Sequence, residues 1–146
     1  MKTQLRLDLT REPRYGADDF VVSPANQAAA ALVMEDWRAW PAGLLAIVGP
    51  PGSGKTHLAR MWAQAVDAAI LTPPLSASPP GLMLIEDADR WTDADGLFHL
   101  LNSLQPGSAL LLTARTPPSQ WPTTLPDLRS RLNAMTTTEI EAPDDV

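Results

Sequence analysis

The sequence Gly49-Pro50-Pro51-Gly52-Ser53-Gly54-Lys55-Thr56 has the spacing G-x-x-x-x-G-K-T of a phosphate-binding loop. An apolar run, 44–48, precedes it, and a run compatible with a helix, 57–66, follows it. The glycines allow a tight turn, and the backbone amides and the helix N-terminus then bind phosphate oxygens. We expect Lys55 to neutralise the β- and γ-phosphates and Thr56 to offer its hydroxyl to Mg²⁺. The eight residues therefore predict a mononucleotide site.

The composition narrows the functional classes. The chain has 146 residues, of which 45% are hydrophobic, so we expect one folded domain with its own core. The absence of cysteine excludes disulfides, thiol catalysis and cysteine zinc sites. A net charge of −6 without a basic run argues against broad binding to a nucleic-acid backbone. Because no apolar run has the length of a membrane span and the N-terminus lacks a signal-peptide core, we expect a cytoplasmic location and no membrane partner.

Apolar strands alternate with helical segments along the chain. The strands are expected at 44–48, 68–71, 82–85, 109–113 and 136–141, and the helices at 24–37, 57–66, 93–104 and 127–132. Ser23 is expected to cap the first helix, with Pro24 at its first position. The strands lack an alternating polar pattern, which is typical of strands buried on both faces. The sequence therefore predicts an α/β fold of the P-loop NTPase type, with a mostly parallel five-stranded sheet and helices on both faces.

Two carboxylates follow the third apolar strand. In nucleotidases one acidic residue at a strand end helps to hold Mg²⁺ and another orients the attacking water. We assign the metal role to Glu86 and the water-orienting role to Asp87. A surface acidic turn is the alternative, because further aspartates lie nearby. The end of the fourth strand, 113–115, falls where open α/β sheets bind ligands, and a polar group there would sense a γ-phosphate.

The first residues alternate between polar and apolar side chains, and a polar segment, 10–19, follows them. The pattern is compatible with an edge strand of the domain. The same pattern is typical of a linear motif that docks in the groove of a partner protein. In such a motif Gln4 would lie in a polar pocket, and the leucines would lie in apolar pockets: Leu5, Leu7 and Leu9. We favour docking, because the pattern precedes a tether and a nucleotide-binding module.

Several of these segments together resemble the AAA+ ATPases, and within them the DnaA-like branch. Residues 20–27 are similar to the segment that contacts adenine in that branch, 49–56 to its phosphate loop, 84–87 to its acidic strand end, and 111–115 to its sensor strand. The resemblance implies that Asn26 lies near the base. His57 lies beside the loop, where it could contact a phosphate, but a position on the helix surface is the favoured interpretation.

The turn 127–132 is similar to the "box VII" segment, whose last arginine reaches the nucleotide of a neighbouring subunit. That arginine corresponds to Arg131, whereas Arg129 is expected to give structural support. The N-terminal 4–9 resembles the peptide with which the Hda proteins bind the sliding clamp (the β subunit of DNA polymerase). Hda proteins stimulate ATP hydrolysis by the DnaA initiator, which prevents repeated initiation.

The resemblance implies a regulator that binds the clamp and DnaA, reaches DNA only through the clamp, and can form a homo-oligomer. Its cofactors would be ADP or ATP with Mg²⁺. The domains would be a clamp-binding peptide and tether, 1–19, an AAA+ base domain, 20–142, and the start of a missing helical lid, 143–146. The segment 72–81 is too short for the helical insertion with which initiators grip single-stranded DNA.

Two departures from the family keep other functions open. AAA+ proteins usually carry aspartate in the metal position and glutamate in the water position, and Glu86 and Asp87 reverse this order. We therefore expect slow intrinsic hydrolysis, with Arg131 acting as an activator of another ATPase. One alternative is a non-hydrolysing nucleotide-binding adaptor of the replisome, such as a helicase loader. Another is a small-molecule P-loop kinase, for which the chain offers few arginines and no lid.

Overall fold

A computed structural model describes residues 20–72, 81–91 and 93–141. The predicted clamp-binding peptide with Gln4, Leu5, Leu7 and Leu9, the expected start of a lid at 143–146, and most of the short segment 72–81 lie outside these residues. Within the described ranges, no helix is long and apolar enough to cross a membrane.

Five strands form one sheet in the order β2-β3-β4-β1-β5, and every pairing is parallel. Their bounds are Leu44–Val48 for β1, Ala69–Leu71 for β2, Leu82–Ile85 for β3, Ala109–Ala114 for β4 and Thr137–Glu139 for β5. The two central strands, β1 and β4, are buried along their whole length. This agrees with their continuous apolar sequences, since a central parallel strand is covered on both faces. The predicted five-stranded α/β fold is confirmed.

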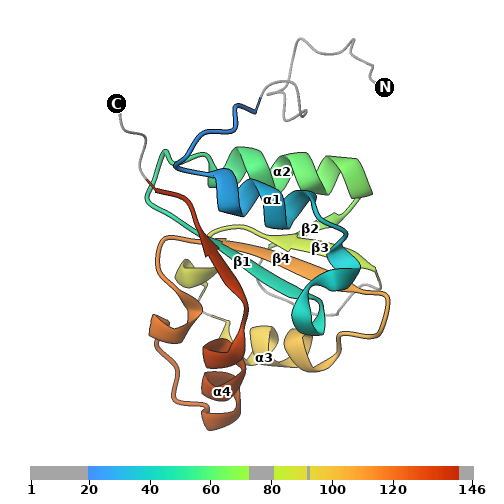
Figure 1. Cartoon of the computed structure of the whole chain (residues 1–146). Coiled ribbons are helices and arrows are strands. Elements are labelled where there is room, and N and C mark those ends of the chain that lie inside the picture. Colours follow the sequence, from blue (N-terminus) through green and yellow to red (C-terminus); the bar gives the residue numbers. More distant parts are fainter. Residues whose placement is uncertain (1–19, 73–80, 92, 142–146) are drawn as a thin grey trace.

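Helices cover both faces of the sheet, as predicted (Figure 1). Helices α1, Gln27–Met34, and α2, Lys55–Val66, pack on one face, and α3, Ala94–Asn102, and α4, Pro126–Ala134, pack on the other. Two apolar cores result. Successive residues of β1 alternate between them, so that Leu45 and Ile47 face α2 whereas Leu44 and Ala46 face α3 and α4.

The first helix is shorter than predicted, and Ser23 does not cap it. Residues 24–26 form a turn in which the Asn26 amide donates to the Ser23 carbonyl and the Ser23 amide donates to Asn26 Oδ1. Asn26 is therefore the N-cap residue, and α1 begins at Gln27. The helix ends at Met34 because Glu35 is extended. The last helix, by contrast, is longer than predicted and starts with proline at its first turn, where the missing amide costs nothing.

Candidate nucleotide site

The predicted nucleotide-binding segments meet at the carboxyl edge of the sheet. The phosphate loop follows β1, the acidic pair follows β3, and Arg115 follows β4, which lies between these two strands. The Gly49 amide donates to the Ala114 carbonyl at 3.0 Å, so the start of the loop is fixed to the end of β4. Open α/β sheets bind their ligands at this edge.

The loop needs glycine at three positions for different reasons. Gly52 and Gly54 have φ angles of 78° and 98°, which L-residues with side chains rarely adopt. Gly49 has an ordinary φ but no room, because a Cβ there would lie 2.8 Å from the Ile140 carbonyl oxygen and 2.8 Å from Ser53 Oγ. Sequence spacing and backbone conformation thus agree that this segment is a tight phosphate loop.

Two polar side chains are buried within the loop. Lys55 and Ser53 are each 7% exposed. Lys55 Nζ donates to the Pro50 carbonyl at 3.2 Å, and Ser53 Oγ has no hydrogen-bond partner within the described residues. A buried hydroxyl without a partner is rare in folded proteins and needs a reason, such as a ligand. The N-terminus of α2 also has no side-chain cap, which leaves its first amides available to an anion.

Residues 20–26 lie against the start of α2. The Phe20 ring meets the His57 ring edge-on, with centroids 5.3 Å apart. The Asn26 side chain holds the segment in shape, because Nδ2 donates to the Val21 carbonyl at 3.0 Å and Oδ1 accepts from the Ser23 amide. Direct contacts of Asn26 and His57 with a nucleotide stay predictions. The geometry gives each of them a local contact that the sequence did not reveal.

The acidic turn is tied to the neighbouring strand. Asp87 is exposed and has a φ angle of 55°, a left-handed conformation that is uncommon for a residue with a side chain. Its amide donates to Thr113 Oγ1 at 3.0 Å, and Thr113 is fully buried. Arg115 Nε reaches Asp89 Oδ2 at 3.3 Å. The polar end of β4 therefore positions the acidic turn. The phosphate-sensing role expected for 113–115 stays a prediction.

Glu86 is paired with a residue that the sequence reasoning missed. Arg60 Nε, from α2, donates to Glu86 Oε2 and forms a salt bridge with it. The signal was present in the spacing, because Arg60 lies four residues after Thr56 and hence on the same face of the helix. No group of three or more His, Asp or Glu side chains that could hold a metal exists in the described part of the chain. Thr56 is exposed in the first turn of α2, and its metal role stays a prediction. Glu86, already paired with an arginine, does not fit the metal role.

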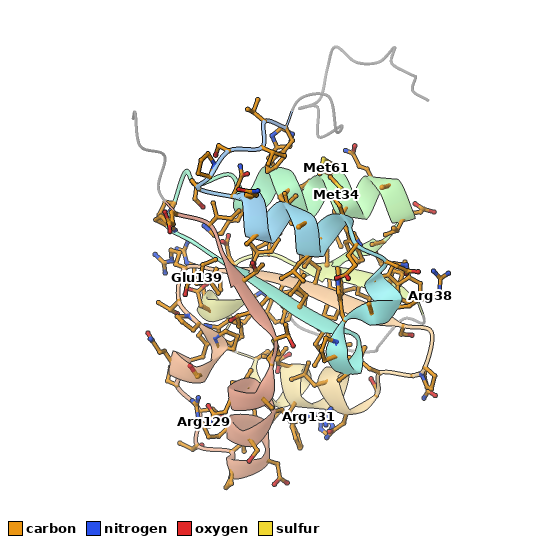
Figure 2. The ribbon with its side chains drawn as sticks, in the orientation of Figure 1. Met34, Arg38, Met61, Arg129, Arg131 and Glu139 are labelled. Atoms are coloured by element: carbon orange, nitrogen blue, oxygen red, sulfur yellow. The ribbon has the colours of Figure 1, made fainter. Side chains whose placement is uncertain are left out.

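The two arginines of α4 have different surroundings (Figure 2). Arg129 donates to the carbonyls of Ser119 and Trp121 and to Asn133 Oδ1, so it ties the proline-rich loop 117–125 to α4. This agrees with the expected structural role of Arg129. Arg131 is half-buried, and its guanidinium donates to the Leu101 carbonyl near the end of α3.

Arg131 is not close to the phosphate loop of its own chain. It lies on the face of the sheet opposite α2, beside α3 (Figure 2). There it lines an open cavity of about 1000 Å³, together with Trp37, Trp40, Leu104 and Met135. The cavity includes the residues that precede β1 and β4, so it lies at the amino edge of the sheet. A contact of Arg131 with a nucleotide would have to involve another molecule.

Comparison with known proteins identifies the fold. No protein-family model and no curated protein matches the chain. Among solved structures, domain III of the Thermotoga maritima replication initiation protein DnaA has a TM-score of 0.73 at 23% identity, with 91% of this chain and 69% of that one covered. DnaA bound to AMPPCP and single-stranded DNA has a TM-score of 0.70 at 20% identity, covering 90% and 51%. The fold is similar to that of domain III of DnaA.

A third similar structure is AMPPCP-bound DnaA from Aquifex aeolicus, with a TM-score of 0.67 and 19% identity, covering 89% of this chain and 50% of that chain. The chain thus spans about half the length of the two DnaA proteins solved with AMPPCP. At these identities the likeness shows the DnaA-like fold.

Proposed function

We propose that this chain is a nucleotide-binding regulator of DNA replication that acts on the DnaA initiator, as Hda proteins do. Nucleotide binding is the foundation of this proposal. The observation that carries it is the buried Ser53 hydroxyl without a partner, inside a glycine loop that also buries Lys55. DnaA proteins of similar fold have been solved with AMPPCP, which supports nucleotide binding by this chain.

The exposed side chains beside the loop are suited to a base. Val21 and Val22 are 77% and 58% exposed, and Phe20 anchors the segment to His57 at the start of α2. Apolar side chains left in water next to a phosphate site gain from covering an aromatic base, since burial of apolar surface contributes about 25 cal/mol per Å². In the proposed complex the loop holds the phosphates of ADP or ATP and residues 20–22 cover the base.

Arg131 is the residue proposed to act on DnaA. An arginine supplied in trans stabilises charge on the transferring phosphoryl group and contributes about 10³–10⁵ in rate. The position of Arg131 on the face away from its own loop favours action on another molecule. The open cavity around it leaves one side of α4 accessible to a partner.

The N-terminal peptide is proposed to bind the sliding clamp through Gln4, Leu5, Leu7 and Leu9. Binding to a clamp on DNA raises the effective concentration of the regulator near the initiator without new contacts at the catalytic interface. The clamp would therefore increase the stimulation of DnaA, whereas the nucleotide affinity of this chain would change little.

Intrinsic hydrolysis by this chain is proposed to be slow. Asp87 is a methylene shorter than the usual glutamate, and Glu86 is already paired with Arg60. We expect fewer than about one turnover per second from the isolated protein. Its nucleotide would then serve to hold the fold and the partner surface, and the hydrolysis would take place on DnaA.

The decisive experiment combines ATP-loaded DnaA, clamp loaded on DNA, and this protein, and follows hydrolysis of the DnaA-bound ATP. Stimulation that requires both the clamp and this protein supports the proposal. Clamp binding without stimulation would instead favour a nucleotide-binding adaptor. One observation favours that second candidate, because the contact of Arg131 with the Leu101 carbonyl gives this arginine a structural role in its own chain.

A further inference from the structure

Helix α2 carries an arginine that pairs with a carboxylate to which the sequence assigned a metal role. Thr56 and Arg60 are four residues apart and lie on one face of the helix, with Thr56 in the first turn. From that face Arg60 reaches across to Glu86 at the end of β3 and forms a salt bridge with its carboxylate. The arginine thus pairs with one of the two side chains assigned to Mg²⁺ from the sequence and lies one helical turn after the other.

The pair is partly shielded from water. The side chains of Arg60 and Glu86 are 35% and 21% exposed, unlike the Arg38–Asp36 pair, whose side chains are 70% and 55% exposed. Screening by water weakens exposed pairs most, so the Arg60–Glu86 pair is the harder of the two to break. A cation that competes for Glu86 would have to displace the guanidinium from this partly buried pair.

The length of the acidic side chain makes this pairing reachable. Glutamate is one methylene longer than the aspartate expected in the metal position, and the longer side chain extends from the strand end to the helix. Mg²⁺ also demands near-ideal octahedral oxygen geometry and tolerates little displacement of its ligands. A carboxylate held by an arginine on α2 does not meet that demand.

We propose that Arg60 replaces the metal as the positive partner of Glu86, so that this site retains its nucleotide independently of Mg²⁺. The proposal rests on the proposed nucleotide binding and refines it. The phosphates are held by the loop amides, the N-terminus of α2 and Lys55, and the positive charge near the acidic strand end is a fixed part of the protein. Metal supply then does not control whether the site is filled.

The experiment measures the affinity of the full chain for a fluorescent ADP analogue, in buffer with Mg²⁺ and in buffer with EDTA. For the wild-type protein we expect the two dissociation constants to agree within about threefold. Arg60→Gln frees the Glu86 carboxylate, so this variant should gain a metal dependence of about tenfold, with tighter binding in Mg²⁺. Arg38→Gln removes an arginine from an ion pair remote from the loop and is the matched control, with the wild-type pattern expected.

A wild-type affinity that falls about tenfold or more in EDTA overturns the proposal, whether or not Arg60→Gln folds. An equal lack of metal dependence in wild type and Arg60→Gln also contradicts the role of Arg60. Absence of binding in both buffers has a different meaning, because it contradicts the proposed nucleotide binding itself. Circular dichroism of each variant shows whether its affinity is measured on folded protein.

Discussion

The Asp87 amide donates a hydrogen bond to Thr113 Oγ1 at 3.0 Å, and this contact joins the acidic turn after β3 to the end of β4. Asp87 needs such support because its φ angle of 55° is unfavourable for a residue with a side chain. Thr113 is the only polar residue of its strand and is fully buried. The hydrogen bond from the Asp87 amide therefore explains why an otherwise apolar strand contains a threonine.

Thr113→Val tests this relationship. The substitution keeps the shape of the side chain but removes the acceptor, which leaves the Asp87 amide without its partner. We expect the free energy of unfolding to fall by about 1–3 kcal/mol, measured by urea denaturation. Thr113→Ser retains the hydroxyl and should retain most of the stability. Equal losses in the two variants would mean that packing of the methyl group, and not the hydrogen bond, is what matters.

Two glycines of the phosphate loop should respond differently to alanine. In Gly49→Ala the new Cβ meets the Ile140 carbonyl and Ser53 Oγ at 2.8 Å, so the loop must shift away from the Ile140 backbone. In Gly52→Ala the space is open and the cost comes from its φ angle of 78° alone, about 1 kcal/mol. We expect nucleotide affinity to fall further for Gly49→Ala, as measured by titration with a fluorescent ADP analogue. A larger loss for Gly52→Ala would contradict the crowding at Gly49.

Arg131→Ala should abolish the stimulation of DnaA while clamp binding remains. We expect a loss of about 10³-fold or more in the hydrolysis rate that this protein adds. Because Arg131 also donates to the Leu101 carbonyl, the variant will lose some stability, and thermal unfolding should be recorded with the ATPase assay.

Arg131→Lys separates these two roles. A lysine retains the charge and can still donate to the Leu101 carbonyl, but it lacks the planar fork that binds a phosphoryl group through two bonds. We expect near wild-type stability and a large loss of stimulation. Full stimulation by Arg131→Lys would contradict the assignment of Arg131 as an arginine finger.

Arg129→Ala is the complementary variant on the same helix. Arg129 donates to Ser119, Trp121 and Asn133, and its removal leaves the carbonyl of the buried Trp121 without this donor. We expect a loss of about 1–3 kcal/mol in the free energy of unfolding, together with stimulation in proportion to the folded fraction. Loss of stimulation from fully folded Arg129→Ala would place this residue at the DnaA interface as well.

Replacing Gln4 and Leu5 with alanine should abolish capture of the protein by immobilised clamp. The substitution falls in the peptide and leaves the residues of the nucleotide site in place, so nucleotide affinity is expected to stay at the wild-type value. Stimulation of DnaA should fall with loss of the tether, and it should partly recover at high protein concentration, because the peptide acts through effective concentration. Clamp binding that survives the double substitution would remove the peptide from the proposal.

The sequence alone determined the strand-loop-helix at 44–66, the five strands and their coverage by helices. These features depend on neighbours in the chain. Glycine spacing fixes the loop, and continuous apolar runs favour strands buried on both faces. The ends of the helices were less well predicted. In the first helix, the Ser23 amide donates to Asn26 Oδ1 and forms a turn at 24–26, and this local hydrogen bond competes with capping of the helix by Ser23.

Only the tertiary structure decided the partners of the site residues. Glu86 pairs with Arg60 across 26 positions, Asp87 with Thr113 across 26, and Arg131 with Leu101 across 30. Each pair joins two elements whose relative position is set by the strand order and by packing on the two faces of the sheet. The loop could be read locally because its chemistry lies within eight residues, whereas a long-range pair becomes fixed only when the whole sheet assembles.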